Sequence, residues 1–211
     1  MGIGRRVFAT VTALAFILPL TSSGLDARGD INFFLGQKKL ADDSLEPLDR
    51  QFEFGTQMSF GGEKWPVAIA VDIMLSADAE SVNVDYYDYY YYGYYSYDGY
   101  IVAATAEIDV GVRKTWEFDT NPIRPYVGGG LGIMSGAVVL TDDDGDEIES
   151  DSDATVGFWA GGGVFWRLGS KFNLGLSLRY SKAELDLSKV SLEKKTDVGG
   201  FHAGLLLGWG W

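Results

Sequence analysis

The sequence predicts an all-β protein in which eight antiparallel strands form a closed, up-and-down barrel that crosses a membrane. Three observations support this prediction. Apolar and polar residues alternate along most of the chain, the connections between alternating segments are in turn long and short, and most tryptophans lie beside the short connections. A signal peptide is expected to precede the barrel.

The composition limits the possible functions. The chain has 211 residues, a formal net charge of −13, no cysteine and one histidine, His202. This length favours one main domain. An acidic balance argues against nucleic acid as a partner, because phosphates require clustered Lys and Arg. Without cysteine there is no disulfide or thiolate zinc site, and we expect no metal site and no cofactor.

The first segment has the pattern of a secretory signal peptide. Arg5 and Arg6 precede an apolar run over 7–20, and the small residues of 21–24 follow it. A membrane anchor is the alternative, but a helix needs about 20 apolar residues to span a bilayer. We therefore expect residues 1–24 to be a signal peptide cleaved after Gly24, and residues 25–211 to form the barrel domain.

Eight later segments alternate with a period of two, which places successive side chains on opposite faces of a strand. Leu174, Leu176 and Leu178, for example, oppose Asn173 and Ser177. The predicted strands span residues 30–38, 52–60, 67–75, 102–116, 123–140, 154–167, 172–180 and 201–211. Each alternates in this way along its length.

The lengths of the connections distinguish a membrane barrel from a soluble β-sandwich, which would show the same alternation. Long connections are expected at 39–49, 76–99, 141–153 and 182–197, and short ones at 61–66, 117–122 and 168–171. Short turns at one end and long loops at the other are typical of outer-membrane barrels. Such barrels also carry aromatic belts at the membrane interface. We expect an outward belt of five tryptophans at the short-turn end: Trp65, Trp116, Trp166, Trp209 and Trp211.

These features resemble the small eight-stranded outer-membrane barrels of Gram-negative bacteria, of the OmpA transmembrane-domain and OmpX type, often called porin-family proteins. The best local motif is the last strand, FHAGLLLGWGW (201–211), in which alternate apolar residues end in an aromatic one. The resemblance implies location in the outer membrane, contact with its lipid and lipopolysaccharide, and a monomer. It also implies that the barrel-assembly machinery reads the last strand.

Polar residues on the inward face form the main candidate site. By parity these are Glu53, Asp72, Glu107, Asp109, Arg113, Arg124, Arg167, Arg179 and His202. Buried charges are costly unless they are paired. The favoured interpretation is an ion-pair network that plugs the lumen, and the alternative is a path for ions or protons.

Two further features of the inward face have alternative interpretations. His202 could be the base of a lipid-modifying enzyme, but no hydroxyl nucleophile stands beside it in the sequence, so catalysis is disfavoured. Inward glycines of the later strands are expected to make room for bulky neighbours such as Tyr126 and Trp159. The alternative for these glycines is a narrow apolar cavity.

Two long connections have unusual compositions. The segment 86–100 holds ten tyrosines, and it is either an extension of the hairpin or a surface recognition patch. The candidate recognition residues are Tyr86, Tyr87, Tyr89, Tyr90, Tyr91, Tyr92, Tyr94, Tyr95 and Tyr97. The segment 142–153 holds eight acids but lacks the ligand order of a calcium loop, because Leu140 would be the first ligand. It is expected to be a solvated loop, with loose contact to divalent cations as the alternative.

These predictions combine into one functional hypothesis. The chain is expected to be a non-enzymatic outer-membrane barrel with a largely filled lumen and a structural or surface-interaction role. The alternatives are a narrow channel for small or hydrophobic solutes and, third, a lipid-modifying enzyme. The surface ligand is not predicted.

Overall fold

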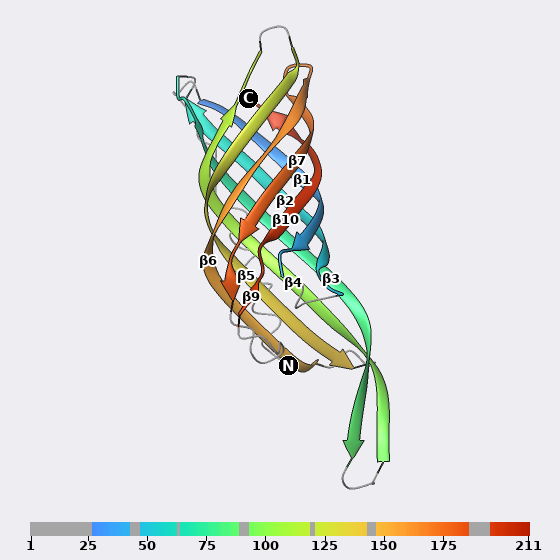
Figure 1. The fold of residues 1–211 in the computed structure, drawn as a ribbon. Coiled ribbons are helices and arrows are strands. Elements are labelled where there is room, and N and C mark those ends of the chain that lie inside the picture. The colour runs from blue at the N-terminus through green and yellow to red at the C-terminus, as the bar shows by residue number, and fades with distance from the viewer. Residues whose placement is uncertain are drawn as a thin grey trace.

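The computed structural model describes residues 27–42, 47–62, 64–88, 93–118, 121–142, 147–185 and 195–211. These residues form a closed antiparallel barrel with the strand order β1-β10-β7-β6-β5-β4-β3-β2 (Figure 1). The eight-stranded, all-β prediction is confirmed. No helix within the described ranges is long and apolar enough to cross a bilayer. The expected signal peptide, 1–24, lies outside the described residues.

The barrel strands differ in length. They are β1 (Ala27–Leu40), β2 (Arg50–Gly62), β3 (Ala68–Asp88), β4 (Gly93–Thr115), β5 (Ile123–Asp142), β6 (Glu147–Leu168), β7 (Phe172–Lys182) and β10 (Gly200–Gly210). A separate two-stranded sheet pairs β8 (Glu184–Leu185) with β9 (Thr196–Asp197). The first and last barrel strands pair with each other, with Ile31 opposite Trp209, so no sheet edge is left within the wall. Closure matters because an edge in hydrocarbon would leave backbone groups without partners.

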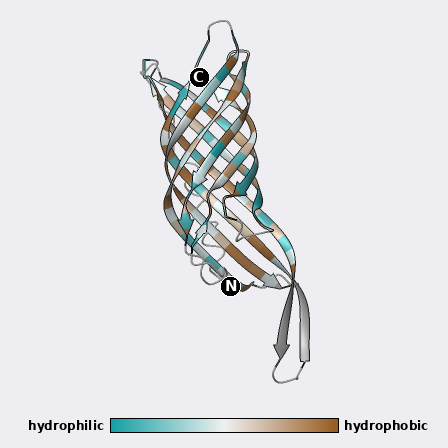
Figure 2. Ribbon diagram, in the orientation of Figure 1, coloured by the Kyte–Doolittle hydropathy of each residue, from teal (hydrophilic) through white to brown (hydrophobic). Residues whose placement is uncertain are grey.

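The alternation read from the sequence becomes the two faces of the wall. In β7, Leu174, Leu176 and Leu178 are exposed on the outside, whereas Asn173 and Ser177 are buried inside. The hydropathy colouring shows apolar and polar residues succeeding each other along the strands (Figure 2). The outer surface is therefore apolar and the interior is largely polar, as a barrel in a bilayer requires.

Two long connections are shorter than the sequence predicted, because the strands continue into them. The segment 76–99 was expected to be a loop, but β3 and β4 stay paired as far as Asp88 and Gly93. This hairpin extends well beyond the other strands in Figure 1. Likewise 147–153, expected in an acidic loop, belongs to β6 and pairs with β5. Backbone pairing across a hairpin can continue after side-chain alternation has faded, so alternation alone missed these extensions.

The long-connection end of the barrel contains an apolar cluster. Leu48, Leu185 and Val198, from outside the barrel strands, pack with wall residues that include Met134 and Trp159. All five side chains are at most 3% exposed. Segments that follow β1 and β7 therefore bury apolar side chains against the inner wall at this end.

Inward glycines face bulky side chains of neighbouring strands. A Cβ atom at Gly204 would lie 2.6 Å from Cζ of Phe34, and one at Gly163 would lie 2.8 Å from the Tyr126 ring. Phe34, Tyr126 and Phe165 are buried together in a second apolar cluster. At these positions the absence of a side chain lets an aromatic ring fill the interior.

Candidate functional site

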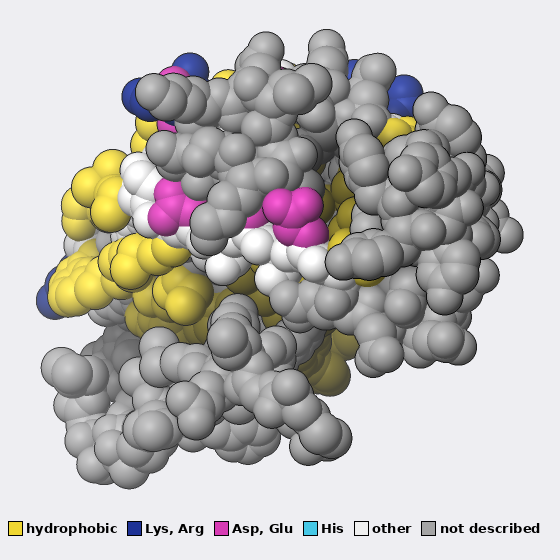
Figure 3. All heavy atoms as spheres, turned by 90° about the horizontal axis from the view of Figure 1, so that it is seen from below, with side chains coloured by type: hydrophobic (Ala, Val, Ile, Leu, Met, Phe, Trp, Pro, Cys, Tyr) yellow, Lys and Arg dark blue, Asp and Glu magenta, His cyan; other side chains and the backbone are white. Residues whose placement is uncertain are grey.

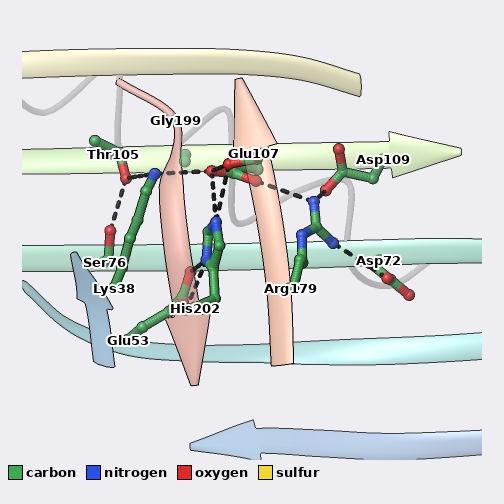
Figure 4. Close-up of polar contacts among 12 residues, drawn as sticks. Lys38, Glu53, Asp72, Ser76, Thr105, Glu107, Asp109, Arg179, Gly199 and His202 are labelled. Carbon is green, nitrogen blue, oxygen red and sulfur yellow. Dashed lines mark hydrogen bonds and ion pairs between the residues drawn. The ribbon is translucent and has the colours of Figure 1, made fainter. Parts of the chain in front are cut away.

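The interior polar residues form a connected cluster in the barrel. Seven of the nine predicted residues are buried, each at most 4% exposed. They come from five strands: Glu53 from β2, Asp72 from β3, Glu107, Asp109 and Arg113 from β4, Arg179 from β7 and His202 from β10. Figure 4 shows most of this cluster, which we call the central network.

Arg179 joins three carboxylates. Its Nη1 lies 3.2 Å from Oδ2 of Asp72, and its Nη2 lies 3.0 Å from Oε2 of Glu107 and also contacts Asp109. Five guanidinium donors in a planar fork allow one arginine to serve several acceptors. Arg179, on β7, therefore reaches across the interior to three acidic residues on β3 and β4.

Arg113 forms the second cationic centre. Its Nη2 donates to both oxygens of Asp72 at 2.9 and 2.8 Å, and its Nη1 donates to Oγ of Ser59 at 3.0 Å. The guanidinium also lies 5.4 Å from the centre of the Tyr126 ring. Asp72 thus accepts from two arginines, which offsets the cost of burying its charge.

His202 lies between two acceptor groups. Its Nδ1 is 2.8 Å from Oε1 of Glu53, and its Nε2 is 2.9 Å from Oγ of Ser181. Ser181 in turn donates to Oε1 of Glu107 at 3.0 Å. With the serine proton directed at Glu107, Nε2 of His202 must donate to the serine oxygen. The Nδ1–Glu53 contact then holds one shared proton, and the Glu53–His202 pair is neutral as a whole whichever of the two groups carries it.

Lys38 is a member of the central network that the sequence analysis did not include. Its Nζ lies 2.7 Å from Oε1 of Glu107 and 2.8 Å from Oγ1 of Thr105, and its side chain is buried. Parity could have identified it, because Lys38 shares the inward face of its strand with Asn32 and Phe34. It is less evident from the sequence, because Lys38 is the last residue of a predicted strand whose alternation is weak.

The charges of the central network balance. The acids Asp72, Glu107 and Asp109 offset the bases Lys38, Arg113 and Arg179, and the hydrogen-bonded Glu53–His202 pair adds no net charge whichever of the two holds the shared proton. A balanced, hydrogen-bonded set is the arrangement in which buried charges cost least. The network therefore needs no additional ion for neutrality.

The other two predicted residues lie apart from this network. Arg167 is near the turn between β6 and β7, where its Nη2 contacts Oδ1 of Asp30 at 2.5 Å. Arg124 forms an ion pair with Glu117 near the connection between β4 and β5. These two arginines form separate polar groups near the short turns.

The arrangement around His202 includes the residue types of a hydrolase triad, Ser181, His202 and Glu53. This grouping is not apparent from the sequence, because the three residues come from three strands. All three side chains are at most 1% exposed, and the serine hydroxyl also faces Glu107. A substrate-accessible nucleophile is a requirement of such chemistry, and this site does not offer one. In the described part of the chain, no three acidic or histidine side chains are grouped to hold a metal ion.

The five predicted belt tryptophans lie at the short-turn end with their side chains outward. Trp65, Trp116, Trp209 and Trp211 are between 40% and 57% exposed, and Trp166 is half-buried. Trp209 packs edge-on against Phe33 and Phe172, with ring centres 6.4 and 6.0 Å apart. Trp159 alone of the six points inward and is buried.

Only part of the predicted tyrosine patch can be placed. The backbone of Tyr86 and Tyr87 pairs with that of Tyr95 and Tyr94 at the far end of the β3–β4 hairpin, and Tyr97 pairs with Val84. Residues 89–92 lie outside the described residues. The described part of the patch is thus a continuation of β3 and β4.

A closed eight-stranded barrel with an apolar outer face, an aromatic rim and a polar interior defines an outer-membrane β-barrel protein of Gram-negative bacteria. Residues 76–202 match the family model described as Opacity family porin protein. The match spans more than half of the chain, which therefore belongs to the Opacity family of porin proteins. No curated protein sequence matches the chain.

Solved structures share this fold. Ail, the attachment invasion locus protein of Yersinia pestis, solved in complex with the heparin analogue sucrose octasulfate, is similar with a TM-score of 0.55 and 14% identity, over 89% of this chain and 100% of Ail. The N-terminal β-barrel domain of Pseudomonas aeruginosa OprF gives a TM-score of 0.49 and 14% identity, over 90% of this chain and 100% of that domain. At these identities the similarity concerns the fold alone.

Proposed function

We propose that this protein is a largely filled outer-membrane barrel with a structural or surface-interaction role, acting neither as a channel nor as an enzyme. The observation that carries the proposal is the neutral central network, which ties six strands together across the lumen. An interior just wide enough for side chains is typical of eight-stranded barrels. Ion pairs and apolar clusters then occupy the space that a channel would need.

The orientation follows the rule for outer-membrane barrels, with short turns in the periplasm and long connections outside. The five outward tryptophans then form the periplasmic interface belt. The last strand serves as the signal for the barrel-assembly machinery, and the barrel is a monomer surrounded by outer-membrane lipid and lipopolysaccharide.

Surface interaction is assigned to the two long hairpins. The β3–β4 hairpin carries the tyrosine-rich segment, and rigid amphipathic tyrosines are effective contact residues. The β5–β6 hairpin carries eight acids in 142–153. Ail was solved with a polyanionic heparin analogue, whereas an acidic external end repels polyanions. We therefore assign a neutral or basic surface ligand to this protein.

Deleting residues 86–97 tests the surface role. The deleted residues pair with each other and with 84 and 85, whereas the pairing of β2 with β3 ends at Ala77. The barrel should therefore still fold, as judged by a compact band that shifts on boiling. Attachment of intact cells to a collagen-coated surface should fall to the level of cells without the protein. Unchanged attachment by the deletion variant would refute the tyrosine assignment.

A further inference from the structure

Three cations lie on the outer surface at the long-connection end of the barrel. Lys39, Arg50 and Lys182 are exposed, and each lies on the outward face of its strand, nearer the long-connection end than the outward apolar residues of that strand. On β7, for example, the outward row runs through Leu174, Leu176, Leu178 and Tyr180 and then ends in Lys182. These cations are therefore placed where hydrocarbon gives way to headgroups.

The register brings the cations together. Arg50 pairs with Lys39, Lys39 with Phe201, and Phe201 with Tyr180, so one rung crosses β2, β1, β10 and β7. Lys182 follows two residues beyond Tyr180. With strands about 4.8 Å apart, Lys39 and Lys182 are separated by roughly 10 Å across the sheet. We call Lys39, Arg50 and Lys182 the basic rim.

Aromatic rings lie beside the basic rim. The ring centres of Tyr180 and Phe201 are 4.9 Å apart, and those of Tyr180 and Phe158 are 6.4 Å apart. Aromatic residues favour headgroup depth, which marks this level as the second interface of the barrel. Long cationic side chains at that depth extend toward phosphate groups.

Competing ion pairs are few. Lys39 lies 3.9 Å from Oδ2 of Asp49, yet its side chain remains 54% exposed. Among the described residues, Arg50 and Lys182 have no ion pair, and the nearby Glu184 pairs with Lys195. In the view onto this end, the Lys and Arg side chains that can be seen lie at the periphery, whereas acidic side chains lie near the middle and, at the upper left, beside basic ones (Figure 3). The positive charge is therefore on the side that meets lipid.

We propose that the basic rim binds the phosphate groups of lipopolysaccharide in the outer leaflet. The guanidinium of Arg50 has the fork geometry that suits a phosphate, and the two lysines add charge on either side. This inference rests on the orientation given under the proposed function. It assigns the lipid contact to one side of the barrel, β2–β1–β10–β7, rather than to the whole circumference.

The test compares wild-type protein with the triple variant Lys39→Gln, Arg50→Gln, Lys182→Gln. The matched control is Lys64→Gln, Lys114→Gln, Lys171→Gln, which removes the same charge near the short turns. All three proteins are purified from outer membranes, checked for a compact unboiled band, and examined by native mass spectrometry for retained lipopolysaccharide. Delipidated samples are then titrated with lipid A, with dephosphorylated lipid A and with inorganic phosphate.

Wild type and control should retain lipopolysaccharide, and the rim variant should lose it. Affinity for lipid A should fall about 100-fold in the rim variant, at the usual contribution of each cation near an anionic surface. Dephosphorylated lipid A should bind as weakly to wild type as lipid A does to the rim variant. The proposal would be overturned if the rim variant retained as much lipopolysaccharide as wild type, or if the control variant lost as much as the rim variant. It would also be overturned if wild type bound dephosphorylated lipid A as tightly as lipid A. Displacement of lipid A by inorganic phosphate would overturn its assignment to lipid. None of these results depends on whether the lumen conducts or the hairpins bind a ligand.

Discussion

The guanidinium of Arg179 lies 4.7 Å from the centre of the Trp159 ring. Gly161 makes this possible, because it stands opposite Arg179 in the register, and a Cβ atom there would lie 3.1 Å from Cβ of Arg179. The indole covers the arginine while carboxylates surround it. Cation–π contacts of this kind strengthen when water is excluded.

Replacing Arg179 should strongly destabilise the barrel. Arg179→Met leaves Asp109, Glu107 and Asp72 with less positive charge, and breaking a buried ion pair typically costs about 3–5 kcal/mol. Urea unfolding in lipid vesicles measures the loss. Lys171→Met, at an exposed turn, is the control and should change stability little. Equal stability of the two variants would show that the network does not support the fold.

A lysine at the same position should rescue only part of the loss. Arg179→Lys restores the charge but has no planar fork to reach three carboxylates at once. Its unfolding free energy should fall between those of wild type and Arg179→Met. Full rescue would mean that charge alone matters and that the geometry described above does not.

The pairing of Glu53 with His202 can be tested with a double-mutant cycle. His202→Gln leaves Glu53 without its partner and Glu53→Gln leaves His202 without its partner, whereas the double variant leaves neither group unpaired. The two changes should therefore be less than additive, with a coupling of about 1–3 kcal/mol in urea unfolding. Glu53→Gln combined with Lys171→Gln provides the reference, which should be additive. Additivity in both cycles would show that Glu53 and His202 do not stabilise the barrel as a pair.

If the inward glycines make room for aromatic rings, a larger side chain at such a position should destabilise the barrel. Gly204→Val places atoms against the Phe34 ring, and overpacking a tight interior costs about 1–3 kcal/mol. Phe34→Leu should recover part of this loss when combined with it. Ala203→Val, on the lipid-facing side of the same strand, is the matched control and should be nearly neutral. No cost at Gly204 would indicate an interior with free space, in favour of a cavity.

The tryptophan belt predicts that these side chains lie at the depth of the lipid headgroups. In a Trp159→Phe variant, the five remaining tryptophans are all at the outer surface, so their fluorescence reports the interface alone. Lipids brominated near the headgroup should quench this fluorescence more than lipids brominated near the chain ends. Stronger quenching from the chain ends would place these residues in the hydrocarbon and refute the belt.

The wall of the barrel could be predicted from the sequence because a period of two decides the face of each residue. Parity placed Asp72 and Arg179 inside, and the structure agrees. Their pairing could not be predicted, because Glu53 and His202 are 149 positions apart and meet only through closure of the barrel. Parity also does not show how far along the barrel axis a residue lies. For this reason it does not reveal that Arg124 and Arg167 lie near the short turns, apart from the central network.

The most direct test of the filled barrel is conductance of the purified protein in a planar bilayer. With the central network and the apolar clusters in place, the protein should give no reproducible single-channel steps. The variant Arg179→Ala, in which the network is broken and space is created, is the comparison and should give steps if it remains folded. Reproducible steps from the wild-type protein would contradict the filled lumen and favour a narrow channel.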